Sequence, residues 1–296
     1  MKALNFKGLI GMKELLQDMQ TRRFWLKFMT KTFALLGTAT VVVKGVVALL
    51  PERADWFGGG TVFVIVLICC TLLGLALSWP RPVQCEYASP QTKISIVKGD
   101  LFEQDGDIVV GIANSFDTEI PHIIEQKSLL GQTIARLYRN DWKRLDADLE
   151  TALSTKPVIG TIEKPGKRNL YELGTVATVA NGPRRIFFSA YSEMSGNNNA
   201  STNIEVVTKS LYMLWDEVGR RGNGQPVSIV PWGGGLSRIS RVLPAQDSIR
   251  LIILTFMFAS RHQKISDELT VVVPEPFFNS LDRLELQAFL NSLRSS

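Results

Sequence analysis

The feature that most constrains this chain is a long run without charge. No Asp, Glu, Lys or Arg occurs between Asp55 and Arg81, and residues 57–77 inside this run are almost wholly apolar. A helix rises about 1.5 Å per residue, so about 20 apolar residues cross the roughly 30 Å hydrocarbon core of a bilayer. Trp56 and Trp79 flank the apolar stretch, where aromatic side chains favour the membrane interface. The run therefore predicts a membrane-spanning helix.

A second apolar stretch, residues 32–50, precedes the first and contains a single charge, Lys44. Pro51 follows it, and only residues 51–55 separate the two stretches. Because so short a link makes the two spans antiparallel neighbours, the sequence predicts a transmembrane hairpin over residues 32–79. Lys44 has two interpretations. Either its ammonium reaches the outer headgroups along its own helix, or it faces an aqueous lumen when several hairpins assemble.

The distribution of basic residues predicts the orientation of this hairpin. Residues 1–80 hold 9 Lys and Arg against 4 Asp and Glu, and most of the basic residues precede the first span. The positive-inside rule places the N-terminus in the cytoplasm, and two spans return the chain there. We therefore expect a multi-pass protein of the cell inner membrane with both termini in the cytoplasm. Residues 1–31 are expected to form a cytoplasmic amphipathic segment, which lies along the interface or packs on the cytoplasmic domain.

The remainder of the chain predicts an α/β domain. Residues 81–296 hold 24 basic and 24 acidic residues, so we expect no binding of nucleic acid through a basic face. Proline and polar residues predict a linker over 80–92, and a domain follows over 93–296. Its strands alternate with helices, which favours a three-layer α/β/α arrangement with a mixed sheet. The predicted strands are 93–98, 107–113, 170–179, 185–191, 227–231 and 269–273, and the predicted helices are 119–139, 202–220, 247–260 and 277–293.

Three segments follow predicted strands, where ligands bind in sheets of this kind. The first holds Asp100, whose carboxylate can accept a hydrogen bond from an exocyclic amine. The second, residues 113–118, is a polar loop that can hold a ribose or pyrophosphate. The third, residues 231–238, has three consecutive glycines that let backbone amides approach a phosphate. The candidate ligand-binding residues are Asp100, Leu101, Asn114, Ser115, Phe116, Asp117, Trp232, Gly233, Gly234, Gly235, Leu236, Ser237 and Arg238.

The same sequence argues against several chemistries. It has no GxxxxGK[ST] motif for ATP hydrolysis, and no GxGxxG follows the first predicted strand. Its three cysteines give no disulfide framework. His122 and His262 fall in predicted helices and are expected to be partly exposed rather than catalytic. We therefore expect no catalytic residue and no metal site.

Two segments resemble a known family. ISIVKGDLFEQDGDIVVGIAN, residues 94–114, resembles the opening of a macro domain, and SIVPWGGGLSR, residues 228–238, resembles the glycine-rich phosphate loop of that family. With the two predicted spans and the motifs SLLGQ and LYELGT, nearly the whole chain resembles the effectors of type II Thoeris antiphage defence. Macro domains bind ADP-ribose and its derivatives. The resemblance implies that Asp100 and Leu101 contact the adenine, that Asn114 and its loop contact the distal ribose, and that residues 233–236 cradle the diphosphate.

The resemblance also implies a function. In this family a TIR-domain partner makes a diffusible nucleotide from NAD, which the resemblance implies is an ADP-ribose conjugate of histidine. The effector binds this signal, forms a homo-oligomer and disrupts the membrane, which leads to abortive infection. The ligand is a signalling nucleotide, and no cofactor is implied.

The chain departs from catalytic macro domains in two places. Gly111 stands where those domains have the first Asn of their Asn-Ala-Ala-Asn pattern, and residues 117–119 lack their first glycine-rich loop. Binding without enzymatic activity is therefore expected. The alternatives are a membrane-tethered ADP-ribosyl or ADP-ribose-derivative hydrolase, and a passive anchor that recruits ADP-ribosylated proteins.

Overall fold

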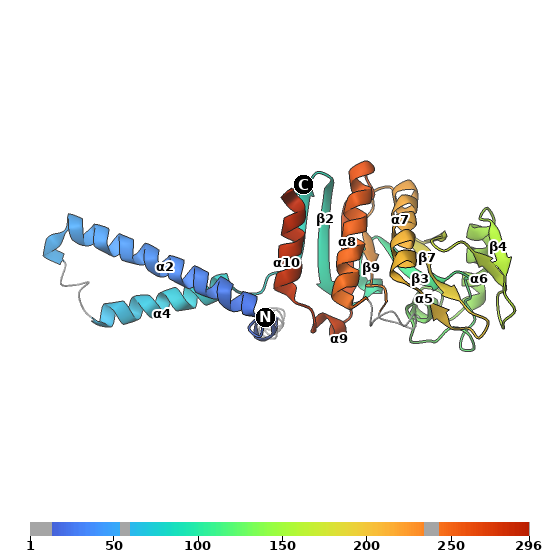
Figure 1. Cartoon of the computed structure of the whole chain (residues 1–296), viewed down its shortest axis with the longest axis horizontal. Coiled ribbons are helices and arrows are strands. Elements are labelled where there is room, and N and C mark those ends of the chain that lie inside the picture. Colours follow the sequence, from blue (N-terminus) through green and yellow to red (C-terminus); the bar gives the residue numbers. More distant parts are fainter. Residues whose placement is uncertain (1–13, 54–59, 234–242, 296) are drawn as a thin grey trace. The chain divides into compact units, whose positions relative to one another are not determined.

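The computed structural model describes residues 14–53, 60–233 and 243–295. The chain divides into two compact units (Figure 1). The first unit comprises Met1–Pro82 and Asp282–Ala288, and the second comprises Val83–Leu281 and Phe289–Ser296.

The first unit is built around a helical hairpin. Helix α2 covers Arg22–Leu49, a 3-10 turn η1 covers Pro51–Arg53, and helix α4 covers Gly60–Leu77. Thr21 starts α2, because its hydroxyl accepts a hydrogen bond from the backbone N–H of Phe24 at 3.3 Å. By length and composition both helices are candidate membrane spans.

The two helices pack against each other through a small residue. A Cβ added to Gly74 of α4 would lie 2.2 Å from the hydroxyl oxygen of Thr32 of α2, so only glycine fits this contact without a shift. The Lys31 ammonium donates to the carbonyl oxygen of Leu77 at 2.6 Å and ties the base of the hairpin together. The outward faces of the hairpin carry large apolar side chains that are exposed, among them Val41 and Phe63.

The predicted N-terminal segment differs from the observed structure. Residues 22–31 are not a separate amphipathic segment but the first three turns of α2. No proline or glycine interrupts this stretch, so the helix that crosses the apolar region begins at the Thr21 cap. Residues 14–18 are helical, and the turn at residues 19–21 separates them from α2. Residues 1–13 of the predicted segment lie outside the described residues.

The main sheet of the second unit has the strand order β1-β2-β10-β9-β3-β7-β6, and β8 extends it by pairing with β7. The five inner strands run parallel, and β1 and β6 run antiparallel at the two edges. The predicted mixed sheet is therefore confirmed. The strands are β1 (Val83–Ala88), β2 (Gln91–Lys98), β3 (Asp107–Ala113), β6 (Val176–Asn181), β7 (Arg184–Met194), β8 (Ala200–Ser201), β9 (Val227–Ile229) and β10 (Glu268–Val273), while β4 (Val158–Thr161) and β5 (Asn169–Tyr171) form a separate hairpin.

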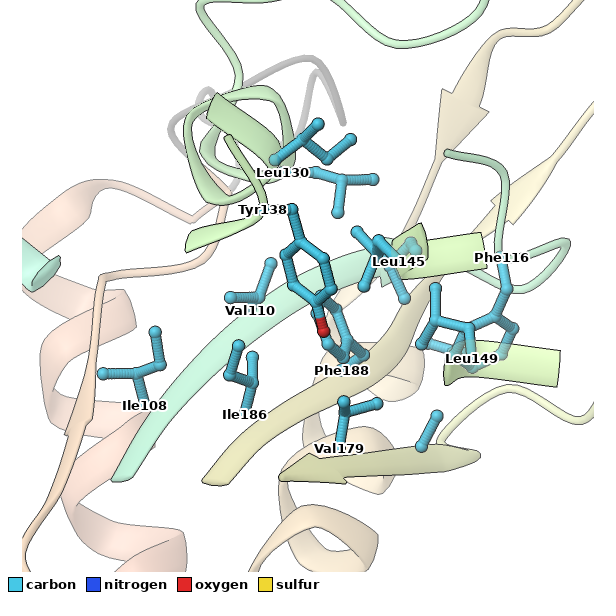
Figure 2. Close-up of a cluster of buried hydrophobic side chains, with 14 of the residues drawn as sticks. Ile108, Val110, Phe116, Leu130, Tyr138, Leu145, Leu149, Val179, Ile186 and Phe188 are labelled. Atoms are coloured by element: carbon cyan, nitrogen blue, oxygen red, sulfur yellow. The ribbon is translucent and has the colours of Figure 1, made fainter. Parts of the chain in front are cut away.

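Helices cover both faces of this sheet (Figure 1). On one face, Leu130 of α5, Tyr138 directly after α5 and Leu145 of α6 pack on buried residues of β3 and β7 such as Val110 and Phe188 (Figure 2). On the other face α7 packs on β7 and on α8. The helices are α5 (Leu129–Leu137), α6 (Trp142–Leu153), α7 (Ile204–Arg221), α8 (Ala245–His262), α9 (Glu275–Phe278) and α10 (Arg283–Ser292), with 3-10 turns η2 (Leu101–Glu103) and η3 (Leu293–Ser295).

The predicted linker over 80–92 is wrong in its centre. Val83–Ala88 form strand β1, which pairs with β2 through Ala88 opposite Gln91 at the turn. Val83, Cys85 and Tyr87 face the core and the residues between them face outward, which is the period-two pattern of a half-buried strand. The prolines on either side of this segment bound the strand instead of marking a structureless connection.

Three further element predictions need correction. The predicted helix over 119–139 begins only at Leu129, where the Ser128 hydroxyl accepts from the N–H of Gly131 at 3.0 Å, and turns that include Pro121 precede it. The predicted strand over 170–179 is split into β5 and β6, because Gly174 between them has a φ of +96°. The last predicted helix, over 277–293, is interrupted between α9 and α10.

Candidate functional site

The carboxyl ends of the parallel strands define one edge of the sheet. Strands β2, β10, β9, β3 and β7 all end there, and the loops that follow β2, β3 and β9 are the three segments singled out in the sequence. In open α/β sheets a ligand binds outside this edge. The structure therefore brings the predicted site residues that it describes to a common edge, although β10 and β9 lie between β2 and β3.

Asp100 lies at the β2 end of this edge. One carboxylate oxygen accepts from the N–H of Phe102 at 3.0 Å and caps η2, and the other forms an ion pair with Arg136 of α5. The Arg136 guanidinium also lies 5.0 Å from the centre of the Phe102 ring. The Asp100 side chain stays 29% exposed, so a ligand amine can approach the carboxylate and compete with Arg136 for it. The next residue, Leu101, is buried in the core.

Asn114 closes the end of β3. Its side-chain oxygen accepts from the N–H of Met194 at 2.9 Å, and its side-chain amide donates to the carbonyl of Tyr171 at 3.3 Å. The side chain is buried, and it joins β7 and β5 to the end of β3. Asn114 therefore has a structural role that the resemblance to macro domains does not imply.

The loop after β3 is held by a buried ion pair. Asp117 and Lys164 lie 2.7 Å apart, and their side chains are 2% and 0% exposed. The same carboxylate accepts from the Ser115 hydroxyl at 2.5 Å and, through its other oxygen, from the N–H of Lys167 at 2.8 Å. A buried charge pair is tolerated when hydrogen bonds satisfy its remaining groups, which these contacts do for the carboxylate. The pair fixes this loop to the segment between β4 and β5.

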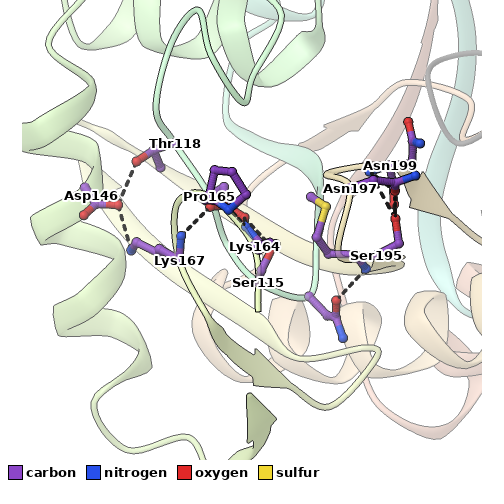
Figure 3. A network of polar contacts seen from close by, with 12 residues as sticks. Ser115, Thr118, Asp146, Lys164, Pro165, Lys167, Ser195, Asn197 and Asn199 are labelled. Carbon is purple, nitrogen blue, oxygen red and sulfur yellow. Dashed lines mark hydrogen bonds and ion pairs between the residues drawn. The ribbon is translucent and has the colours of Figure 1, made fainter. Parts of the chain in front are cut away.

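A second link runs parallel to the first. The Thr118 hydroxyl donates to Asp146 of α6 at 2.7 Å, and the Lys167 ammonium contacts the same carboxylate oxygen at 2.7 Å (Figure 3). Phe116, between these anchors, has a φ of +53° and is fully buried, with its ring 5.4 Å from that of Tyr171 in an edge-on arrangement. The loop after β3 is thus a firmly held element whose Ser115, Phe116 and Asp117 side chains all serve the fold.

An aromatic pair, Tyr191 and Trp232, lies beside Gly111 of β3. Tyr191 of β7 stacks on Trp232, with ring centres 4.7 Å apart and planes inclined by 23°. A Cβ at Gly111 would lie 2.5 Å from the Tyr191 ring and 3.4 Å from Nε1 of Trp232, so the ring occupies the space beside Gly111. Trp232 is buried and its Nε1–H has no hydrogen-bond partner among the described residues. Gly233 has a φ of +102°, which favours glycine.

The remaining predicted residues of the third segment, Gly234, Gly235, Leu236, Ser237 and Arg238, lie outside the described residues. His122, predicted in a helix, lies in the turns before α5, and His262 is the last residue of α8; both are exposed. Among the residues that the structure describes, no group of three or more His, Cys, Asp or Glu is arranged to hold a metal ion.

At the opposite edge of the sheet, Asp107 begins β3. Burial raises the pKa of its carboxyl group, against the opposing effect of a hydrogen bond from the N–H of Arg185 at 2.7 Å and of the Arg185 guanidinium at 3.7 Å. This carboxylate lies at the far end of the strand from Asn114 and belongs to the fold rather than to the candidate site.

Sequence reasoning missed the partners of the predicted residues: Arg136 for Asp100, Lys164 for Asp117, and Tyr191 for Trp232. Two of these contacts leave no local trace, since 36 and 47 residues separate the partners. The third has a signal, because a glycine inside a strand often marks the close approach of another group, and Gly111 does so here.

A family model described as Thoeris protein ThsA, Macro domain, matches residues 94–274. No curated protein matches the chain in sequence. Among solved structures, a point mutant of the Oceanobacillus iheyensis macrodomain is 11% identical with a TM-score of 0.50, over 72% of this chain and 100% of that chain. The same bacterial macrodomain with ADP is 11% identical with a TM-score of 0.49, over 72% and 98%. The first likeness shows the macrodomain fold.

Proposed function

The chain belongs to the family of Thoeris ThsA proteins with a macro domain, and from this premise we propose that it is a nucleotide-gated membrane effector of antiphage defence. Its α/β unit binds an ADP-ribose derivative, the histidine conjugate, that a TIR-domain partner makes from NAD. Binding drives copies of the chain to associate, and the α2–α4 hairpins then disrupt the inner membrane. The observation that carries the proposal is the presence of this macro domain and two candidate membrane spans in one chain.

Asp100 supports the binding of an adenine nucleotide. Its carboxylate lies at the ligand-binding edge, is partly exposed and is held in place by η2, so it can accept a hydrogen bond from the exocyclic amine. Arg136 holds the carboxylate in the unbound state, and a ligand amine replaces or shares that contact. Since Arg136 is 46% exposed, its release to solvent costs little.

The surroundings of Gly111 support binding without hydrolysis. The Tyr191 ring fills the space beside this residue, so no polar side chain from this position of β3 reaches the ligand edge. Asn114 is already committed to Met194 and Tyr171, and Asp117 to Lys164. None of these side chains is free to act as a general base, which favours a site that holds its ligand intact.

The α2–α4 hairpin supports the proposed action on the membrane. Basic residues concentrate before residue 32, where the apolar part of α2 begins, which by the positive-inside rule orients both termini toward the cytoplasm, where the nucleotide is made. A ligand shifts an equilibrium only through unequal affinity for its two states. The nucleotide must therefore bind the associated form more tightly than the free form.

Calorimetry on the full-length chain in detergent micelles tests the proposal, with ADP-ribose and histidine–ADP-ribose as probes. Asp100→Ala is expected to weaken binding about tenfold to a hundredfold, since an unpaired amine costs about 1–3 kcal/mol. Asp100→Asn keeps an oxygen to cap η2 and controls for folding. Asp105→Ala removes the same charge from an exposed position nearby and should leave affinity unchanged. Failure of both probes to bind would remove the proposal, and release of free ADP-ribose from the conjugate would identify a hydrolase instead.

A further inference from the structure

A cavity of about 410 Å³ lies where the β4–β5 hairpin, the end of α6 and the loop after β3 meet. Its lining includes Ser115 from that loop and Tyr171 from β5. It also includes three cationic side chains, Lys156, Lys167 and Arg168. Of the described residues that line it, only Glu150 is acidic. The lining therefore favours an anionic group.

The three cations differ in how far neighbouring carboxylates neutralise them. Lys167 contacts Asp146 at 2.7 Å and Glu150, the acidic residue of the lining, at 3.7 Å. The pair between Arg168 and Glu163, at 3.3 Å, is exposed to solvent and so contributes about 0–1 kcal/mol. Lys156, which is half-buried, forms no ion pair within the part of the chain that the structure describes. Its ammonium retains its capacity for a charge-assisted hydrogen bond to a carboxylate.

The cavity is joined directly to the loop after β3. Lys167 lines the cavity, and its backbone N–H donates to Asp117. Its ammonium reaches Asp146, which also holds Thr118 (Figure 3). Ser115 of the loop is itself part of the lining. A ligand that rests its ribose on this loop would therefore have the cavity next to it.

We propose that this cavity receives the carboxylate-bearing group that distinguishes the nucleotide signal from plain ADP-ribose, and that Lys156 is the cation that recognises the carboxylate. The inference rests on the proposed function and adds to it a specificity-determining residue. Ligand pockets commonly measure about 300–1,000 Å³, so a cavity near the lower end suits a group the size of an amino acid. ADP-ribose alone leaves the cavity without a ligand group.

Calorimetry on the full-length chain in micelles tests this assignment by comparing histidine–ADP-ribose with ADP-ribose. The wild-type chain is expected to prefer the conjugate by about tenfold or more, the effect of one charge-assisted hydrogen bond. Lys156→Ala should lose most of this preference and keep the wild-type affinity for ADP-ribose. Lys156→Arg should retain the preference. Lys143→Ala, which removes an exposed cation from α6 away from the cavity, is the matched control and should behave as wild type.

Three outcomes would overturn the proposal. If the wild-type chain binds both probes equally, the nucleotide function stands and only the cavity assignment fails. If Lys156→Ala weakens both probes by the same factor, Lys156 supports the fold or the nucleotide part and not the carboxylate. If the wild-type chain binds neither probe, the proposed function fails and the cavity assignment fails with it.

Discussion

The two units use the same kinds of apolar residue in opposite ways. In the hairpin Val41 is 71% exposed and Phe63 61%, whereas Val110 of β3 and Phe188 of β7 are fully buried. A large apolar side chain left in water forgoes about 1.5–3 kcal/mol. The α/β unit therefore buries a large apolar core of its own, while the hairpin leaves most of its large apolar side chains exposed. This difference supports the proposal that the α/β unit senses a nucleotide and that the hairpin acts on the membrane.

The same contrast holds for charge. The α/β unit buries Asp117 and Lys164 as a pair with every carboxylate contact satisfied, while Lys44 of α2 stands on an exposed face of the hairpin. In water such a lysine is unremarkable, but in a bilayer its ammonium must reach the headgroups or a polar neighbour. The buried charges of the α/β unit thus pair with each other, whereas the Lys44 charge of the hairpin needs a partner from its surroundings.

The largest expected effect on stability comes from comparing two fragments of the chain, one that begins before β1 and one that begins after it. A fragment that starts at residue 81 should fold and stay soluble, whereas one that starts at residue 89 loses the buried side chains of Val83, Cys85 and Tyr87 and the Tyr87 hydrogen bond to Leu290 at 2.8 Å. At about 1.5–3 kcal/mol for each large side chain, the loss approaches the whole stability of a typical domain. Urea unfolding followed by circular dichroism measures it. An unfolded longer fragment would contradict the autonomy of the α/β unit.

A smaller effect is expected from breaking the buried pair. Lys164→Met leaves Asp117 buried without its cation and should lower the free energy of unfolding by about 3–5 kcal/mol. Lys209→Met is the matched control, because its pair with Glu172 is exposed on both sides and should contribute about 0–1 kcal/mol. Equal losses in urea unfolding of the two variants would show that burial does not govern the strength of these pairs.

In the hairpin the corresponding test uses glycine. Gly74→Ala places a methyl group against Thr32 and should weaken the packing of α2 on α4 by about 1–3 kcal/mol. Gly37→Ala meets nothing within 4 Å and should be neutral or slightly stabilising. Hydrogen exchange of the full chain in micelles, read by mass spectrometry, should show faster exchange in both helices for the first variant alone. Faster exchange in both variants would indicate that α2 packs through its other face as well.

The smallest effect concerns Asp107 and the pH dependence of the α/β unit. Because burial raises its pKa, the folded state holds this proton more tightly than the unfolded state, whose pKa is about 3.9. The stability that it contributes is present below the unfolded pKa and is lost as the pH rises through the folded pKa. Asp107→Asn should therefore gain stability relative to wild type as the pH rises above the unfolded pKa of about 3.9. A difference that stays constant in urea unfolding as the pH rises would contradict the shift.

The sequence was sufficient where one local pattern dominates. The charge-free run predicted α4, and the strands 93–98 and 107–113 lie within β2 and β3 almost residue for residue. The sequence-based prediction failed where prolines lie next to or within a periodic pattern of apolar residues. The prolines around β1 led to the prediction of a linker, although Val83, Cys85 and Tyr87 alternate as in a strand. The apolar residues near Pro121 led to the prediction of a helix from residue 119, but that helix begins at Leu129.

In the candidate site, too, the sequence predicts only the residues that a local pattern marks. Strand-end residues such as Asp100 can be found from sequence, because the end of a strand is a local feature. Their partners cannot, because Arg136 and Lys164 approach only once the sheet has formed and its helices have packed. The cavity beside the loop after β3 is likewise a product of tertiary structure, assembled from α6, β4, β5 and that loop.

The central claim is that the α/β unit senses a nucleotide and the hairpin acts on the membrane, and dye release from liposomes tests it most directly. Liposomes carrying the full-length chain should release dye when histidine–ADP-ribose is added and retain it when the nucleotide is absent. The fragment from residue 81 should bind the nucleotide and release nothing. Release that is independent of nucleotide, or cell killing by the fragment alone in the presence of the signal, would contradict the account.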